Sequence, residues 1–284
     1  MIKIEDVSFT YPITQKKAIQ NLQFEIDKGE IFGFLGPSGA GKTTTQRLII
    51  GLLKGYNGHI YIMGKERRQW KNDFYEKIGV AFDFPNLYSK LTAYENLKLI
   101  SAYYETPCNH ILELLDQVGL LKEKNVKIEH FSKGMKMRLN FIRSMMHKPE
   151  ILFLDEPTSG LDPVNAKIIK DAILDLKHKG TTIFLTTHHM EVAEQLCDRV
   201  AFINDGSISA IDSPSNLMLQ FGEPIVTIGY KKNGILLETK FPMSDLGNNK
   251  DFLDLIASHE IITMHSQEAT LEEIFILLTG RSLL

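Results

Sequence analysis

Residues 36–43 read Gly36-Pro37-Ser38-Gly39-Ala40-Gly41-Lys42-Thr43 and match the eight-residue phosphate-binding loop at every fixed position. The loop follows a wholly apolar run, Ile31–Leu35, and precedes a stretch with helical character, Lys42–Leu53. A strand, a glycine-rich loop and a helix in this order direct backbone N–H groups at phosphate oxygens beside a helix amino terminus. The segment therefore predicts a nucleotide-binding site on an α/β fold.

Two side chains of the loop have expected roles beyond the backbone. Lys42 is expected to reach the β- and γ-phosphates and Thr43 to coordinate Mg²⁺. The residues expected to bind the nucleotide here are Gly36, Pro37, Ser38, Gly39, Ala40, Gly41, Lys42, Thr43 and Thr44. GTPases and small-molecule kinases use the same loop. A GTPase also needs an Asn-Lys-x-Asp base reader, and the nearest stretch, Asn249–Phe252, has its aspartate one position early.

A second group of candidate residues follows another buried strand. The run Ile151–Leu154 ends at Asp155 and Glu156, at the carboxyl end where parallel sheets collect their ligands. Asp155 is expected to hold Mg²⁺ through water, and Glu156 to polarise a water molecule that attacks the γ-phosphate.

Composition limits the class of protein. The chain has 284 residues with 32 Lys and Arg against 35 Asp and Glu, so its net charge of −3 argues against broad binding to nucleic acid. Its apolar runs are far shorter than the roughly 20 residues that span a bilayer. An acidic start and only two cysteines argue against a secretory leader and a disulfide framework. We therefore expect a cytoplasmic chain that does not cross a membrane by itself.

Short apolar runs alternate with helical stretches along the first part of the chain, which predicts a parallel sheet covered on both faces. The run Thr182–Leu185 is a third strand, joined to the second by a helix over Val164–His178. Residues 86–146 contain helical segments only and predict an inserted helical subdomain; these segments are Ala93–Leu99, Ile111–Val118 and Lys133–Met146. Basic residues around Trp70 are interpreted as a solvated helix face: Lys65, Arg67, Arg68 and Lys71, interleaved with Glu66 and Asp73.

Gly222 and Pro224 mark a predicted boundary. Beyond it we expect a small accessory region, residues 222–284, that follows a nucleotide-binding domain of residues 1–221. Its expected strands are Ile225–Tyr230 and Ile235–Lys240, and its expected helices lie near Leu246–Ala257 and Leu271–Leu278.

Further motifs resemble the ATP-binding subunits of ABC transporters. Phe131–Met135 is similar to the family's signature, with Ser132 and Gly134 retained, and it stands shortly before Asp155. Thr158–Asp162 is similar to the D-loop, and Thr187-His188 resembles the switch histidine. Tyr11 resembles the aromatic residue that stacks on adenine. These elements occur in the family's order over residues 1 to about 220.

The resemblance implies an ABC cassette: a P-loop NTPase with a mixed, largely parallel sheet, N-terminal antiparallel strands and an inserted helical subdomain, here with a small α+β C-terminal extension. In the family, two cassettes dimerise head to tail around ATP. Ser132 and Gly134 would then contact the nucleotide of the partner copy, Asp162 of the D-loop is also expected to bind nucleotide, and His188 would contact the γ-phosphate. Because both halves of a site occur on this chain, a homodimer suffices, although a heterodimer is also compatible with the sequence.

Three departures from the family pattern stand out. Asp83 occupies the glutamine position of the Q-loop, where its carboxylate offers an oxygen to Mg²⁺ but adds negative charge near the γ-phosphate. Lys133 and Met135 replace a glycine and the glutamine of the signature, and Met137 stands where a glutamine often precedes Arg138. The Ser-Lys-Gly-Met form and the terminal segment Ala269–Gly280 resemble the exporter branch that moves drugs, antibiotics, peptides or lipids.

The family therefore implies an Mg-ATP hydrolase that powers a separately encoded transmembrane permease from the inner face of the cell membrane. Two alternatives remain at this level. One is a soluble ABC ATPase that acts on ribosomes or DNA, although such relatives usually carry two cassettes or a long coiled-coil insertion. The other is a regulatory module that uses ATP only to switch dimerisation.

Overall fold

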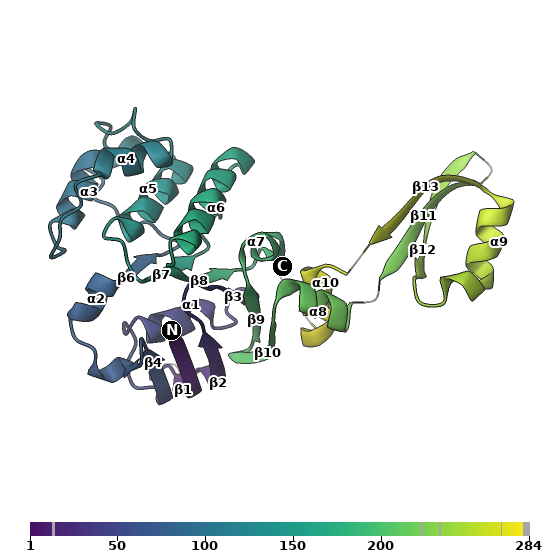
Figure 1. The fold of residues 1–284 in the computed structure, drawn as a ribbon, viewed down its shortest axis with the longest axis horizontal. Helices are drawn as coiled ribbons and strands as arrows, with labels where there is room; N and C mark the ends of the chain where they lie inside the picture. The colour runs from purple at the N-terminus through teal and green to yellow at the C-terminus, as the bar shows by residue number, and fades with distance from the viewer. Residues whose placement is uncertain (13–14, 223, 233, 268, 281–284) are drawn as a thin grey trace. The chain divides into compact units, whose positions relative to one another are not determined.

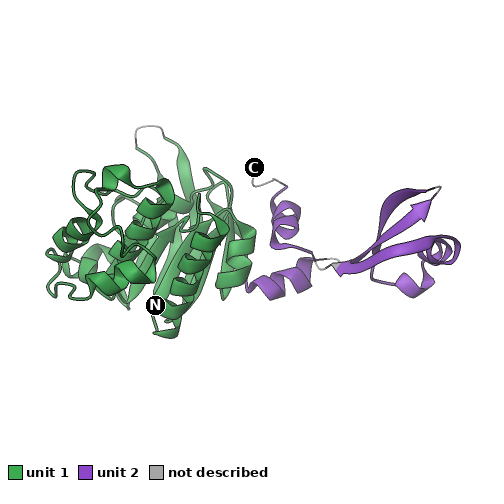
Figure 2. Ribbon diagram, turned by 90° about the horizontal axis from the view of Figure 1, so that it is seen from above, with its two compact units in different colours: residues 1–211, 283–284 green, residues 212–282 purple. Residues whose placement is uncertain are grey.

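The computed structural model describes residues 1–12, 15–222, 224–232, 234–267 and 269–280. The chain divides into two compact units, the first covering residues 1–211 and the second starting at Asp212 (Figure 2). This division falls ten residues before the boundary expected at 221/222, because helix α8 (Pro214–Phe221) packs against helix α10 (Leu271–Thr279). Residues 281–284 of the expected accessory region lie outside the described residues. Among the described residues, no helix is both long and apolar enough to cross a bilayer.

A six-stranded sheet forms the centre of the first unit (Figure 1). Its strand order is β10 (Ser207–Asp212), β9 (Arg199–Asn204), β3 (Ile31–Leu35), β8 (Thr182–Thr187), β7 (Ile151–Asp155) and β6 (Ile78–Ala81). The strands from β9 to β6 pair in parallel. Every residue of β3, β7 and β8 is buried, as their continuous apolar runs predict.

The N-terminal strands form a separate antiparallel sheet in the order β2 (Lys17–Ile26), β1 (Ile2–Thr10), β4 (Asn57–Ile62) and β5 (Lys65–Glu66). Alternate residues of β1 and β2 are buried, so one face of this sheet covers the core. The basic cluster near Trp70 lies at its edge on β5 and the 3-10 helix η1 (Arg67–Gln69).

The prediction of a solvated face is wrong for Arg67, whereas Arg68 and Lys71 are exposed as expected. Arg67 is buried and donates to the carbonyls of Ile49 and Ile50, with its guanidinium 4.1 Å from the centre of the Phe74 ring. The guanidinium thus binds carbonyl groups at the end of a helix, a partner that local sequence does not reveal.

Helices α1 (Lys42–Ile49), α2 (Asp73–Lys77), α6 (Pro163–His178) and α7 (Met190–Leu196) connect the strands of the first unit (Figure 1). Helix α1 ends four residues earlier than expected, because Gly51 takes a left-handed conformation with φ of 81°. Between β6 and β7 the chain forms helical elements: α3 (Ala93–Ser101), α4 (Ile111–Gln117), η2 (Ile128–His130) and α5 (Lys133–Met145). Thr92 begins α3 with a capping box to Glu95.

The second unit contains a three-stranded antiparallel sheet in the order β12 (Ile235–Pro242), β11 (Ile225–Lys232) and β13 (Glu260–Gln267). After the 3-10 helix η3 (Leu246–Asn248), helix α9 (Lys250–Ser258) covers one face of this sheet through Phe252, which packs with Val226, Ile228 and Phe241. The sequence did not predict β13. A β-bulge near Tyr230 disturbs its pairing with β11, so its apolar residues do not alternate regularly.

Aromatic rings tie the two sheets of the first unit together. The ring of Phe184 on β8 lies 5.5 Å from that of Phe34 and 5.8 Å from that of Phe153, in the main sheet, and 6.5 Å from that of Phe24 on β2. All four side chains are at most 4% exposed. Contacts of this kind contribute about 0.5–1.5 kcal/mol per pair beyond the buried area.

We predict that Phe184→Ala lowers the stability of the first unit by about 3–5 kcal/mol, because it opens a cavity where the two sheets meet. Thermal melting of the purified chain measures the effect. Phe84→Ala is the matched control, since the Phe84 side chain is 80% exposed. Equal melting temperatures for the two variants would contradict this account of the core.

Candidate nucleotide-binding and catalytic site

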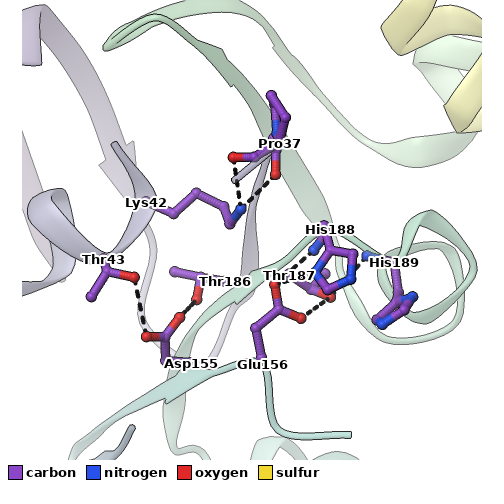
Figure 3. A network of polar contacts seen from close by, with 10 residues as sticks. Pro37, Lys42, Thr43, Asp155, Glu156, Thr186, Thr187, His188 and His189 are labelled. Atoms are coloured by element: carbon purple, nitrogen blue, oxygen red, sulfur yellow. Dashed lines mark hydrogen bonds and ion pairs between the residues drawn. The ribbon is translucent and has the colours of Figure 1, made fainter. Parts of the chain in front are cut away.

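A cavity of about 620 Å³ lies at the carboxyl ends of β3, β7 and β8, where the predicted motifs meet. Figure 3 shows the polar contacts at its centre. The predicted site residues that line it are Tyr11, Ser38, Gly39, Gly41, Lys42, Thr43, Thr44, Asp83, Asp155, Glu156 and His188. Segments as far apart in the sequence as Tyr11 and Gly206 therefore converge on one site.

The loop after β3 has the backbone that a phosphate cradle needs. Gly39 and Gly41 adopt positive φ of 82° and 115°. A Cβ atom on Gly36 would come within 2.2 Å of the Ile203 carbonyl oxygen, so that position has room for glycine only. Pro37 and Ala40 complete the loop, and Ala40 N–H donates to the Pro37 carbonyl at 3.2 Å.

Lys42 folds back onto this loop. Its ammonium group donates to the carbonyl oxygens of Gly36 and Pro37, at 2.5 and 3.1 Å. Burial lowers the pKa of Lys42, and the negative charges of Glu156 and Asp155 oppose that shift. The cation is thus already placed at the loop to which phosphate oxygens would bind.

Asp155 is a buried carboxylate held by two hydroxyl groups. Thr186 donates to its Oδ1, and Thr43 donates to its Oδ2 at 3.2 Å. Burial raises the pKa of Asp155 above the ordinary value of 3.8, although the hydrogen bonds from Thr186 and Thr43 oppose the shift. The charges of Glu156 and Asp83 raise it further. In the folded protein without ligand, the ionised form of this side chain is therefore disfavoured.

Glu156 is oriented by three donors. Thr187 Oγ1 donates to its Oε2 at 3.0 Å, while the backbone N–H and the Nδ1 atom of His188 bind its Oε1 at 3.0 and 2.7 Å. Glu156 itself has a positive φ of 50°, a backbone conformation that is energetically unfavourable for residues other than glycine. The three hydrogen bonds hold the carboxylate in place beside His188 (Figure 3), and Glu156 lines the cavity.

The donor set beside the loop fits Mg²⁺. Thr43 and Asp155 bring a hydroxyl and a carboxylate oxygen next to each other, and Mg²⁺ binds through a few oxygens while it keeps several waters. Glu156, His188 and His189 also lie close, with one ligand atom of each within 4.8 Å of the others. Two of those three ligands are nitrogens, so this second group suits Mg²⁺ poorly.

Three predicted residues lie away from this cavity. The exposed Ser132 caps α5 and accepts from Met135 N–H, while Gly134 follows in the first turn. Asp162 caps α6 through the N–H groups of Val164 and Asn165. None of the three is among the residues that line the cavity in the described part of the chain. Within one copy Ser132 and Asp162 are helix caps and Gly134 lies in a first helical turn, so the predicted contacts of Ser132 and Gly134 with nucleotide need another copy.

Tyr11 and Asp83 lie at the predicted place, and their roles stay predictions. The Tyr11 hydroxyl contacts Thr44 Oγ1 at 3.1 Å, and its ring packs edge-on against Phe9. Asp83 lines the cavity close enough for its charge to raise the pKa of Asp155.

Sequence reasoning missed several residues of the site. Thr186 and Thr187 on β8 bind the carboxylates of Asp155 and Glu156, and the turn Asp205-Gly206 reaches the cavity from between β9 and β10. The dipeptide Asp-Gly signals a turn. Its place beside the phosphate loop follows only from the pairing of β9 with β3.

The comparisons agree with this geometry. The ABC transporter family profile matches residues 19–159, and a profile described as the fluoroquinolone efflux ABC transporter C-terminal domain matches residues 225–268. The chain is 48% identical to a fluoroquinolones export ATP-binding protein of Mycobacterium tuberculosis. The alignment covers 100% of this chain and 94% of that protein. It is 35% identical to a linearmycin resistance ATP-binding protein of Bacillus subtilis, with 100% of this chain and 99% of that protein covered.

A dimeric ATP-binding cassette solved in a post-hydrolysis state with ADP and Pi is similar in structure, with a TM-score of 0.68 and 28% identity. The match covers 75% of this chain and 98% of that cassette. The chain therefore belongs to the ATP-binding proteins of ABC transporters and is an ATPase of that family. Within this family, the chain falls in the branch of the export and resistance proteins named above. The structural match also confirms the predicted cassette fold.

Asp155→Asn should raise the melting temperature of the nucleotide-free protein near pH 8. The variant removes a buried charge whose pKa is raised on folding, so the ionised wild-type carboxylate destabilises the folded state at high pH. Towards about pH 5 the wild-type side chain takes up its proton more readily, and the gain should shrink. Asp171→Asn, on an exposed position of α6, is the control. A gain that grows on acidification would contradict the assignment.

Thr187→Val should lower ATP turnover about tenfold and leave ATP affinity unchanged, because the hydroxyl orients Glu156 through a hydrogen bond to a charged group. Initial hydrolysis rates and a nucleotide-binding titration measure the two quantities. Thr187→Ser keeps the hydroxyl and should retain the wild-type rate. Wild-type turnover in the valine variant would show that Thr187 does not position the carboxylate.

Proposed function

We propose that this chain hydrolyses Mg-ATP as a homodimer and so powers a separately encoded permease that exports a drug or antibiotic, with fluoroquinolones as the leading candidates. The observation that carries the proposal is the convergence of Lys42, Asp155, Glu156 and His188 on one cavity that Ser132 and Gly134 do not reach. Those two residues then serve the cavity of a second copy.

Catalysis in this proposal rests on positioning and charge. Glu156 accepts a proton from the attacking water while Thr187 and His188 hold its carboxylate in place. Because Nδ1 of His188 binds Glu156, Nε2 is the ring nitrogen that remains to contact the γ-phosphate. Lys42 and the loop N–H groups stabilise the charge on the phosphates, which is the main contribution in phosphoryl transfer.

Mg²⁺ would be held by Thr43 and, through water, by Asp155. The metal supplies charge neutralisation at the β- and γ-phosphates. We also propose that Asp83 contacts this ion, directly or through water, in place of the family's glutamine. A further carboxylate at the site raises the local negative charge, so ATP binding should depend on Mg²⁺ more strongly than it would with a glutamine.

The content of the chain supports the homodimer. One copy carries the loop, both acids and the histidine as well as the signature residues, so two copies form two complete sites. The exposed position of Ser132 at the start of α5 leaves its hydroxyl and the helix terminus accessible to a nucleotide on the partner.

The permease, the position at the inner face of the membrane and the exported compound are inferred from the relatives. The relative named for fluoroquinolones export matches the whole chain, and the profile for the C-terminal domain of fluoroquinolone efflux transporters matches the second unit. The alternative of an ABC switch without transport gains no support from these comparisons.

Glu156→Gln should leave ATP binding intact and lower turnover by about 10²–10⁴, the usual contribution of a general base. The amide keeps the size of the side chain but cannot accept the proton. Glu113→Gln, at an exposed position of α4, is the control and should keep wild-type turnover. An unchanged rate of ATP hydrolysis in the Glu156→Gln variant would show that Glu156 is not the general base.

Transport itself is tested in a susceptible host that expresses this chain with the permease from the neighbouring reading frame. Fluoroquinolone resistance that appears with the wild-type pair and disappears with Glu156→Gln supports the proposal. ATP hydrolysis without resistance or permease-dependent stimulation would favour the switch instead.

A further inference from the structure

The outer edge of β12 in the second unit is open. It is the edge strand of its sheet, and among the described residues its second side has no strand partner. Ile235, Leu236 and Leu237 are 63%, 59% and 40% exposed. An exposed aliphatic edge strand is a template for pairing with another strand, and proteins usually protect such edges.

The two edges of the sheet differ in regularity. The pairing of β12 with β11 is continuous over eight residue pairs, from Ile225 with Pro242 to Lys232 with Ile235. The pairing of β13 with β11 is interrupted by a bulge beside Gly229 and Tyr230. A bulge twists a strand and hinders further pairing, so β12 is the edge that remains regular and accessible.

The sequence of β12 is complementary to itself when two copies run antiparallel about Thr239. In that register Glu238 lies opposite Lys240 of the second copy, and the ion pair occurs twice by symmetry. Leu237 lies opposite Phe241 of that copy. Shifting the centre of symmetry to Leu237 would instead place Glu238 opposite Leu236, and charge complementarity would be lost.

Among the described residues, Glu238 and Lys240 on β12 have no charged residue directly opposite them in the sheet. Opposite Glu238 on β11 is Gly229, and opposite Lys240 is Thr227. Both side chains are exposed, and within the described residues neither forms an ion pair. Phe241 faces α9 in the core of the unit, so by strand alternation Glu238 and Lys240 project from the opposite face. Neither residue directly opposite them on β11 is charged, so a second β12 would give each of them a directly opposed partner of opposite charge.

We propose that the outer edge of β12 docks on the β12 edge of a second copy of this chain, antiparallel and centred on Thr239, to form a continuous six-stranded sheet. The proposal rests on the homodimer proposed above, which brings two second units into one complex and raises their effective concentration. It gives the C-terminal unit a contact between the two copies that lies outside the nucleotide sites.

Cysteine cross-linking of the full chain without nucleotide tests this register. In a Cys108→Ser background, which leaves only the buried Cys197, Thr239→Cys should form an interchain disulfide under mild oxidation. Directly opposed residues in an antiparallel pair have Cα atoms about 4.5–5.5 Å apart, within the range for a disulfide. Ile235→Cys is the matched control, because two copies of this residue would lie about 27 Å apart, eight residues along the strand.

Charge reversal tests the ion pairs. In the Thr239→Cys protein, Glu238→Lys and Lys240→Glu alone should each slow cross-linking about three- to tenfold, because like charges then face each other. The double variant should restore the wild-type rate. Basal ATPase activity and circular dichroism check that each variant is folded. A double variant as slow as the single ones, or a control that cross-links as fast as Thr239→Cys, would overturn the proposal.

A separate measurement distinguishes this proposal from that of the ATP-bound homodimer. Glu156→Gln with Mg-ATP should dimerise in light scattering whether or not β12 is altered. If that variant dimerises but does not cross-link at Thr239, β12 docking is refuted while the proposed ATP-bound homodimer stands. Cross-linking of Thr239 to the permease rather than to a second copy would also refute it.

Discussion

Parallel pairing of β3, β8 and β7 is the constraint on which the site depends. Leu35 pairs with Thr187, and Asp155 pairs with Thr186, so the strands end together at one edge of the sheet. The phosphate loop, the acidic pair and the switch histidine each begin at one of these ends. Since the strands are buried on both faces, the aromatic contacts around Phe184 fix their positions and with them the spacing of the three motifs.

The site keeps charged groups in an environment that disfavours them. Burial lowers the pKa of Lys42 and raises that of Asp155, and Glu156 adopts a left-handed backbone conformation. Hydroxyls of Thr43, Thr186 and Thr187 and the loop carbonyls hold these groups until ligands arrive. A bound phosphate and a metal ion would supply opposite charge to each group. Burial therefore costs stability in the nucleotide-free protein, and in return the charged groups are already in place before the nucleotide binds.

The two units divide the tasks of the chain. The first contains the phosphate loop and the acidic pair, and its Ser132 faces solvent as the cap of a helix. The second unit has a small core around Val226, Ile228, Phe241 and Phe252 and leaves a regular strand edge uncovered. Both features are incomplete in one copy. A second copy completes the first through the proposed ATP sandwich and the second through β12.

The sequence by itself predicted an α/β nucleotide-binding fold, because the phosphate loop and Asp155-Glu156 each follow a short apolar strand that is recognisable locally. The resemblance of its motifs to the ABC family added the cassette architecture and the role of His188. The sequence did not reveal β13, whose bulge breaks the alternation, or the burial of Arg67, whose partners are carbonyls at the end of α1. Nor did it assign Thr186, Thr187 and Gly206 to the site. Those contacts join segments that are distant in sequence, so only strand pairing and packing decide which side chains meet. Local pattern fixes the type of each element, whereas the tertiary structure decides its neighbours.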